Sequence, residues 1–304
     1  MARMNASLSH PASPPANIDE ECSRIATPIG SGFRYACVPL KDVDRRAIIA
    51  LRALDLTLAE ITSTQSESQV ARHKLEWWRQ ALHQALSFDQ AEHPILLALH
   101  ACMHENLRMA LIPLVELRLG AAVIELDYQG FETQRDLLAY LDGAGGTMHE
   151  AYARILQIPE TQHAALRSIG ALHHRLQRLT YLGRHSRQGH IYLPAEQLAK
   201  AGVSEADFHR PNAADHLGPL LQNELADIQK QYQDAIQELR AITRRPDAFF
   251  RILIALDRAQ IDLLHRHKAA VLTTRPETTP FQRLVTAWWS SKRSLPQFPN
   301  ASKE

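Results

Sequence analysis

The sequence has few of the residues that interrupt helices. Its 304 residues include 12 glycines and 16 prolines, together about 9% of the chain against a usual background of roughly 12%. Aromatic residues are also scarce, at 6%, whereas strands of sandwiches and barrels are rich in aromatic and β-branched residues. The shortage of helix breakers favours long helices, and the shortage of aromatics disfavours an all-β fold.

The chain also lacks an excess of either charge. It has 34 Lys and Arg against 33 Asp and Glu, so the basic excess typical of nucleic-acid binding is missing and no nucleic-acid partner is expected. Apolar residues make up 45%, which excludes an acidic disordered chain. The cysteines, Cys22, Cys37 and Cys102, are odd in number and fit no paired spacing, which predicts a reducing compartment without a disulfide framework.

Long apolar runs are missing as well. No run reaches the roughly 18 residues that a bilayer-spanning helix needs. Residues 1–27 lack the apolar core of a secretory signal and carry acids, which transit peptides avoid. We therefore expect a soluble, cytoplasmic protein.

The spacing of apolar residues predicts an all-α protein of about ten helices in one domain. The clearest three- and four-residue steps are those of Ala47, Ile48, Leu51, Leu54, Leu58 and Ile61. Residues 1–27, rich in Pro, Ser, Asn and Ala, are expected to be a loose tail, residues 28–293 the folded domain, and residues 294–304 a frayed end.

Two candidate sites have structural interpretations. Gly143, Gly145 and Gly146 lie between helical segments and not after a strand, so they do not form a dinucleotide fingerprint and are interpreted as close helix packing. His100 and His104 are one helical turn apart, a spacing that can hold zinc, but no third ligand is visible. We interpret them as ordinary helix residues and predict no metal site.

A basic cluster without any acid is the strongest charge pattern. It contains His173, His174, Arg175, Arg178, Arg184, His185, Arg187 and His190. Such a cluster can bind an anion by charge-assisted hydrogen bonds. The alternative is a solvated basic face, because charge runs usually lie at the surface.

Two adjacent tryptophan pairs, Trp77-Trp78 and Trp288-Trp289, also stand out. Neighbours on a helix are about 100° apart, so one ring of each pair can face the core and the other an edge. Lys292 and Arg293 follow the second pair, and aromatic plus basic residues are typical of a membrane interface. The alternative for this pair is core packing followed by a solvated tail.

Several segments together resemble the squalene/phytoene synthase family of head-to-head prenyl transferases. They are Gly30-Ser31-Gly32-Phe33, Leu75 to Leu82 with Trp78, Gly130 to Tyr140, and Gly189-His190-Ile191-Tyr192-Leu193-Pro194 with Gly202-Val203 after it. The resemblance covers about Gly30 to Arg293. It implies an isoprenoid-synthase-like helical bundle around a central apolar cavity.

The departures from the family pattern concern its metal site. Catalytic members bind Mg²⁺ and two diphosphates with two Asp-rich motifs, since Mg²⁺ takes hard carboxylate oxygens. In residues 59–63, which resemble the first motif, Glu60 is the single acid. At the second motif Tyr181, Arg184 and His185 stand where the family has acids. Gln177 stands at the position of the family's Asn, and His190 at that of its Arg. No cofactor is therefore expected.

A narrower resemblance is to the non-catalytic branch of the family, which includes an assembly factor of respiratory complex I. It rests on residues 53–61, on Trp78-Arg79-Gln80-Ala81 and on the Trp-basic ending at residues 288–293. The resemblance implies a pseudoenzyme that binds a prenyl or other lipid, or an anion. Its implied partners are respiratory-complex subunits. The implied location is the cytoplasm, with peripheral contact at the inner membrane as the alternative.

The implied site has two ends. The anion end comprises Arg178, Arg184, His185, Arg187 and His190, and the pocket wall comprises Leu54, Leu58, Ile61, Gln177, Tyr181 and Tyr192. One alternative is an active prenyl transferase on farnesyl or geranylgeranyl diphosphate, with Glu60 as the remaining Mg²⁺ ligand. A second alternative is a plain interaction scaffold.

Overall fold

The structure is a computed structural model that describes residues 16–64, 68–88, 90–210 and 213–298. These residues form helices and turns without any strand. The all-α prediction is therefore confirmed.

The helices in the first half of the chain are α1 (Ala16–Ala26), α2 (Gly32–Ala36), α3 (Asp42–Thr64), α4 (Ser68–Ser87), α5 (Pro94–Cys102), α6 (Glu105–Leu126) and α7 (Gln134–Leu141). Those in the second half are α8 (Thr147–Ile155), α9 (His163–Thr180), α10 (Leu182–Arg187), α11 (Ala195–Lys200), α12 (Ala213–Ile242), α13 (Ala248–His267) and α14 (Pro280–Lys292). The remaining turns are a π-helix, η1 (Asp142–Gly146), and the 3₁₀ segments η2 (Glu160–Gln162), η3 (Glu205–His209) and η4 (Lys268–Leu272). The described chain exceeds the expected ten or so helices because short ones such as α2 and α10 show no readable period.

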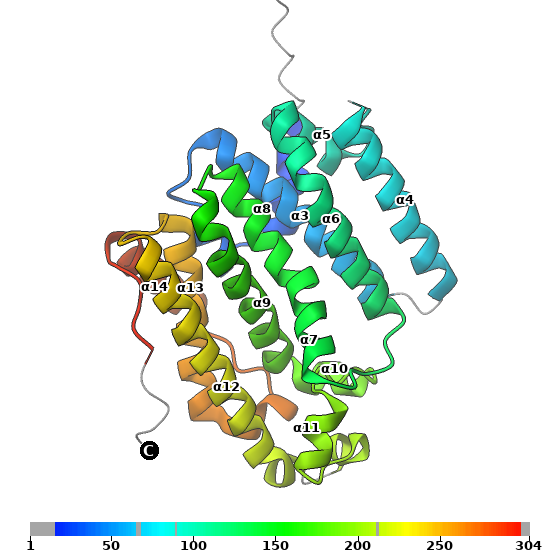
Figure 1. Cartoon of the computed structure of the whole chain (residues 1–304), viewed down its shortest axis with the longest axis vertical. Coiled ribbons are helices and arrows are strands. Elements are labelled where there is room, and N and C mark those ends of the chain that lie inside the picture. The colour runs from blue at the N-terminus through cyan, green and yellow to red at the C-terminus, as the bar shows by residue number, and fades with distance from the viewer. Residues whose placement is uncertain (1–15, 65–67, 89, 211–212, 299–304) are drawn as a thin grey trace, which may run out of the picture.

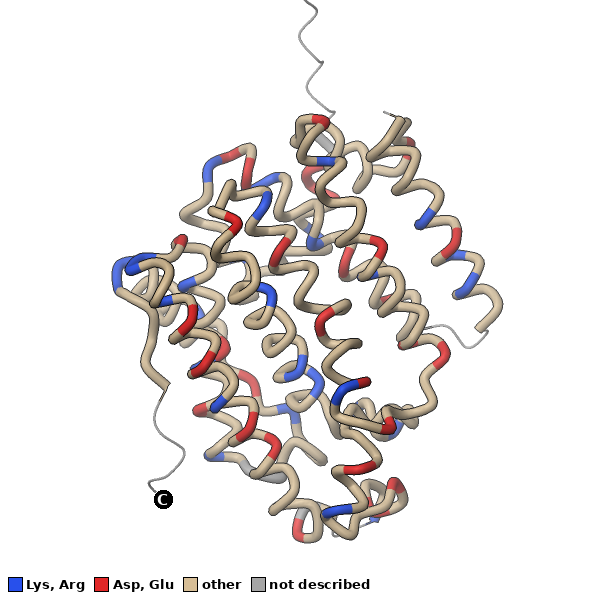
Figure 2. Tube along the Cα trace, in the orientation of Figure 1, with Lys and Arg blue, Asp and Glu red and all other residues tan. Residues whose placement is uncertain are grey.

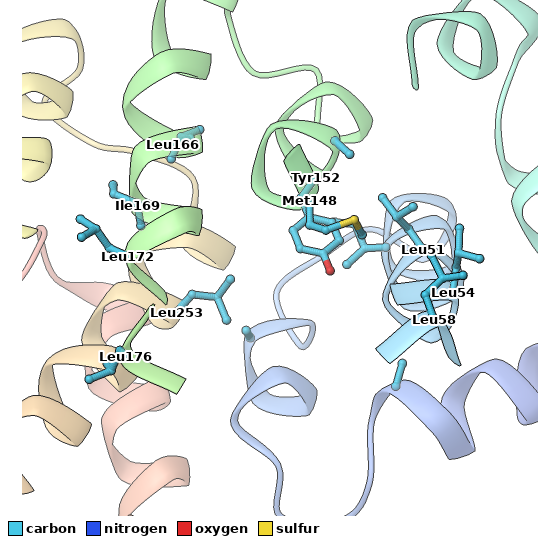
Figure 3. Close-up of a cluster of buried hydrophobic side chains, with 14 of the residues drawn as sticks. Leu51, Leu54, Leu58, Met148, Tyr152, Leu166, Ile169, Leu172, Leu176 and Leu253 are labelled. Carbon is cyan, nitrogen blue, oxygen red and sulfur yellow. The ribbon is translucent and has the colours of Figure 1, made fainter. Parts of the chain in front are cut away.

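The helices are arranged around a central pair. Figure 1 shows α8 and α9 in the middle of the bundle, with α3, α4 and α6 on one side and α12, α13 and α14 on the other. Figure 3 shows Leu51, Leu54 and Leu58 of α3 beside Met148 and Tyr152 of α8. The predicted apolar face of α3 is thus buried against the centre of the bundle.

The glycine run is a close helix contact, as predicted. Gly145 in η1 lies against Gly170 in α9, and a Cβ on either residue would come within 2.4 or 2.5 Å of the other's carbonyl oxygen. A real Cβ does not tolerate such a distance, so only glycine fits at both positions. The contact brings the middle of α9 close to η1 and α8.

Both ends of the domain extend beyond the expected boundaries. Residues 16–26 form α1 and not a tail, with Ile18, Cys22 and Ala26 buried against α3 and α5. Their four-residue spacing matches one helix face, a signal that composition alone conceals. At the other end Leu295 and Phe298 are buried, and the Phe298 ring stacks on Tyr232 of α12. The rest of both expected tails, residues 1–15 and 299–304, lies outside the described residues.

Among the described residues, no helix combines the length and the apolar character that crossing a bilayer requires. All three cysteines are free thiols. Burial raises the pKa of Cys22 and of Cys37 to about 12, so both remain protonated at neutral pH.

Candidate functional site

A small polar cavity lies at the centre of the bundle, where α3, η1, α8, α9 and α13 meet. Its volume is about 20 Å³, which is close to the space that one water molecule needs. Its walls are Phe33, Arg52, Asp55, Ala144, Gly145, Met148, His149, Tyr152, His173, His174, Gln177 and Leu253. The expected apolar interior is therefore replaced by a nearly closed interior with charged and imidazole side chains.

Asp55 is the acid of α3 that faces this centre. Its carboxylate accepts hydrogen bonds from Arg118 Nε of α6, at 2.7 Å, and from Arg52 Nη1, at 2.6 Å. Burial opposes ionisation of Asp55, but the charges of Arg118 and Arg52 outweigh burial and hold its pKa below the usual value. Asp55 is thus an ionised carboxylate neutralised by two guanidinium groups.

Glu125 of α6 forms the second buried ion pair. Arg178 Nη2 of α9 donates to its Oε1 at 2.7 Å, and the hydroxyls of Tyr140 and Thr62 donate to its two oxygens, each at 2.7 Å. Burial opposes its ionisation, but Arg178 and Arg118 lower the pKa below the ordinary value. Helices α3, α6, α7 and α9 are therefore joined through one carboxylate.

Two histidines at the centre, His174 and His149, have lowered pKa values. Arg178 Nε donates to His174 Nε2 at 3.0 Å, which requires that nitrogen to be unprotonated. Burial, and then the Arg178 charge, hold the pKa of His174 well below its usual value. Burial lowers the pKa of His149 in the same way, and neither ring nitrogen of His149 has a hydrogen-bond partner among the described residues.

A third polar chain connects α9 with α12 and α13. His173 Nδ1 donates to Asp257 at 2.7 Å, and the Tyr232 hydroxyl donates to the other oxygen of that carboxylate at 2.8 Å. Gln177, an expected pocket residue, lines the cavity and bonds His173 Nε2 at 2.7 Å. Each carboxylate of the interior therefore has a resident donor.

The predicted anion end is divided by the fold. Arg178 is partly buried beside Glu125, while Arg184 and Arg187 are exposed on α10. His185 and His190 lie near Arg178, around Tyr192 and Tyr128, and burial together with the Arg178 charge lowers both pKa values, that of His185 to about 3. The structure thus brings three of the five residues together, and the partner of their arginine is an internal carboxylate.

The predicted pocket wall is also divided. Leu54, Leu58 and Ile61 are buried in the apolar core of α3 and do not line the cavity. Tyr192 lies under the Arg178 guanidinium, 4.4 Å from the ring centre. Tyr181 is half-buried at the end of α9, where its hydroxyl bonds Arg275 and Glu277.

Glu60 and the remaining candidates lie away from the centre. Glu60 is exposed near the end of α3, where its charge acts on Arg24 of α1. His104 is the N-cap of α6 and accepts from the Leu107 amide at 3.2 Å, which gives this residue a structural role. No group of three or more metal-ligating side chains was found within the described ranges.

Sequence reasoning missed the residues that dominate the centre: Asp55, Arg118, Glu125, Tyr140 and His149. One signal was available, because Asp55 occupies the same helix face as Leu51 and Leu58. A charged residue on an apolar face is rarely buried unless it is paired. The pairing itself joins residues 63 positions apart, which no local pattern reveals.

Known proteins resemble this chain at two levels. Residues 29–282 match the family model "Squalene/phytoene synthase". The rat and mouse proteins named "NADH dehydrogenase (ubiquinone) complex I, assembly factor 6" (Rattus norvegicus and Mus musculus) are 24% and 23% identical over 183 residues, which are 59% of this chain. Those 183 residues are 54% of the relatives, so the matched part of this chain spans about half their length.

Solved structures share the fold. A dehydrosqualene synthase in complex with a ligand has a TM-score of 0.76 at 15% identity, over 90% of this chain and 95% of that one. A squalene synthase from Alicyclobacillus acidocaldarius has a TM-score of 0.60 at 14% identity, over 84% and 92%. At these identities the likeness concerns the fold, which confirms the isoprenoid-synthase-like bundle. Because the family model covers most of the chain, this protein belongs to the squalene/phytoene synthase family.

Proposed function

We propose that this protein is a non-catalytic member of its family that assists the assembly of respiratory complex I. The observation that carries the non-catalytic part is the state of the interior carboxylates. Asp55 is neutralised by Arg52 and Arg118, and Glu125 by Arg178. The assembly role is supported by the names of the rat and mouse relatives.

Resident guanidinium groups compete directly with a metal ion. Mg²⁺ needs near-octahedral oxygen ligands and usually takes carboxylates. A metal at Asp55 would have to displace the buried Arg118 and the partly buried Arg52, and the displaced Arg118 guanidinium would remain as an unpaired buried charge. We therefore propose that the protein works without a metal or other cofactor.

The lipid or anion ligand implied by the sequence remains a prediction, and the size of the central cavity bears on it. The cavity of about 20 Å³ is far smaller than the roughly 300–1,000 Å³ of small-molecule pockets. Binding of a prenyl chain in this cavity would require the helices around it to separate, whereas a partner protein needs only the surface. We therefore propose respiratory-complex subunits as the principal partners, with the protein peripheral at the inner membrane.

The second candidate is an active head-to-head prenyl transferase with an altered metal site. It is favoured by the fold likeness to dehydrosqualene synthase, at a TM-score of 0.76. In this candidate Glu60 binds Mg²⁺, and the exposed Arg184 and Arg187 hold diphosphate. If this candidate is right, the protein forms a prenyl product, and its formation depends on the Glu60 carboxylate.

One pair of experiments separates the two functions. The purified protein is incubated with farnesyl or geranylgeranyl diphosphate and Mg²⁺, beside an authentic squalene synthase. In parallel, the gene is deleted in its own organism and NADH:ubiquinone oxidoreductase activity is measured in membranes, with succinate oxidation as the control. We expect no product and a selective loss of the NADH activity.

The Glu60→Ala variant sharpens the comparison. If the proposal holds, this variant restores complex I activity in the deletion strain as well as the native protein does. A head-to-head product that disappears in Glu60→Ala would refute the non-catalytic role. Unchanged complex I activity after deletion would refute the assembly role.

A further inference from the structure

Helix α14 carries an apolar face that points away from the rest of the molecule. On this helix Phe281 is 73% exposed, Leu284 46%, Trp288 53% and Trp289 46%. These positions follow the three- and four-residue steps of one helix face. The opposite face is anchored to the core through Ala287 and Ser290.

The alternative of core packing for this tryptophan pair is therefore wrong for both rings. In the other pair, Trp78 is buried and Trp77 is half exposed.

A neighbouring loop extends the apolar face. Ile29 is 93% exposed. The next residue, Gly30, contacts the start of α14: its carbonyl accepts from Arg283 at 3.4 Å, and a Cβ on it would lie 3.0 Å from Pro280. We call Ile29, Phe281, Leu284, Trp288 and Trp289 the α14 face.

The α14 face is bordered by positive charge. Helix α14 and residues 293–298 contain no Asp or Glu. Lys292 Nζ lies 4.5 Å from the Trp288 ring centre, and the Arg293 guanidinium lies 4.2 Å from that of Trp289. The cations are thus held at the level of the exposed rings.

The turn between α12 and α13 adds to this charge. Arg244 and Arg245 are exposed there. Arg251 donates to the Ser291 carbonyl at the end of α14, at 2.8 Å, and its own amide donates to the carbonyl of Asp247, two residues after Arg245, at 3.1 Å. This turn therefore lies near the end of α14, and Figure 2 shows basic segments gathered at that edge of the molecule.

Large exposed aromatic residues beside basic residues fit a lipid surface better than a folded protein partner. Tryptophan is enriched at membrane–water interfaces, and a basic amphipathic helix lies in the headgroup plane of anionic bilayers. Each Lys or Arg near such a surface adds to the attraction, which salt weakens. The nearest acid of this turn, Asp247, is engaged with the Phe249 amide at 2.8 Å.

We propose that α14 is a membrane-docking helix. The α14 face enters the headgroup region of an anionic bilayer, and Lys292, Arg293, Arg244 and Arg245 bind the lipid phosphates. This inference rests on the peripheral membrane location in the proposed function and names the helix that would make the contact. Its test uses only purified protein and lipid, so it can fail while the assembly role still holds.

The test is co-sedimentation of the purified full-length protein with vesicles. One set is phosphatidylcholine, and the other contains about one third phosphatidylglycerol. We expect binding to the anionic vesicles that falls with added salt. The Trp288→Ser/Trp289→Ser variant is expected to bind about tenfold or more weakly, because it removes the two largest apolar contacts, and Lys292→Glu/Arg293→Glu to lose the preference for anionic lipid.

Matched controls come from exposed residues elsewhere. Trp77→Ser/Phe88→Ser also removes two half-exposed aromatic residues, and Arg135→Glu/Lys200→Glu reverses two exposed charges. Both controls are expected to bind vesicles like the native protein. Failure of the native protein to bind, or equal losses in control and α14 variants, would overturn the proposal. Self-association through the α14 face without vesicle binding, measured by light scattering, would also overturn it.

Discussion

Arg118 of α6 and Asp55 of α3 form a buried ion pair, with Arg118 Nε 2.7 Å from the carboxylate and the arginine only 1% exposed. The pair lies at the central cavity, whose walls include Asp55 and Arg52. Because the two residues come from different helices, the ion pair joins α3 to α6 and is a structural element of the bundle.

The first prediction concerns this pair. Arg118→Met leaves Asp55 buried with Arg52 as its single remaining partner, so we expect the free energy of unfolding to fall by about 3 kcal/mol. Urea denaturation followed by circular dichroism measures the change. The double variant Asp55→Leu/Arg118→Met removes both charges and is expected to regain part of that loss. A double variant less stable than Arg118→Met would show that the two residues are not coupled.

The second prediction concerns the η1–α9 contact. Gly145→Ala places a Cβ 2.4 Å from the Gly170 carbonyl oxygen, so we expect a loss of about 1–3 kcal/mol or more. Gly120→Ala is the control, since nothing lies within 4 Å of a Cβ at that position of α6. It is expected to stabilise the protein by about 0.4–1 kcal/mol. Equal effects in a thermal melt would contradict the close contact.

The third prediction compares two buried tyrosines. The Tyr140 hydroxyl donates to Glu125 at 2.7 Å, and Tyr140→Phe removes one donor from that carboxylate. We expect a loss of about 1–3 kcal/mol. The Tyr152 hydroxyl has no hydrogen bond of normal geometry, although the charge of Arg52 acts on it. Tyr152→Phe is therefore expected to be nearly neutral in denaturant titrations, and the reverse order would contradict the assigned contacts.

The fourth prediction concerns pH. The pKa values of His149 and His174 are lowered in the folded state, and that of His185 to about 3. Below pH of about 6.5 the unfolded chain binds protons that the folded protein does not, so stability is complete above that pH and is lost as pH falls. Each such histidine adds a slope of up to about 1.4 kcal/mol per pH unit.

The variant that checks this pH dependence is His149→Leu. Between about pH 6.5 and 5, it is expected to reduce the pH dependence of the free energy of unfolding by the contribution of one bound proton, up to about 1.4 kcal/mol per pH unit. His73→Leu, on the exposed side of α4, serves as the control and is expected to leave the slope unchanged. An unaltered slope in His149→Leu would mean that His149 titrates alike in both states.

Local sequence patterns predicted much of the fold because they reflect local physics. The apolar steps of α3 and the packing role of the glycine run both appear as expected. The site was predicted less well. Arg178 and Gln177 do reach the centre, but Arg184 and Arg187 are exposed on α10.

The sequence by itself determined that the chain is helical, which faces are apolar, and which family pattern it follows, since each of these depends on residues a few positions apart. Only the tertiary structure decided that Asp55 and Glu125 are held by arginines and that both tryptophans of α14 remain exposed. Those outcomes depend on which helices lie side by side. Burial then makes each unpaired charge costly, so the partners that the fold brings together determine what the interior can bind.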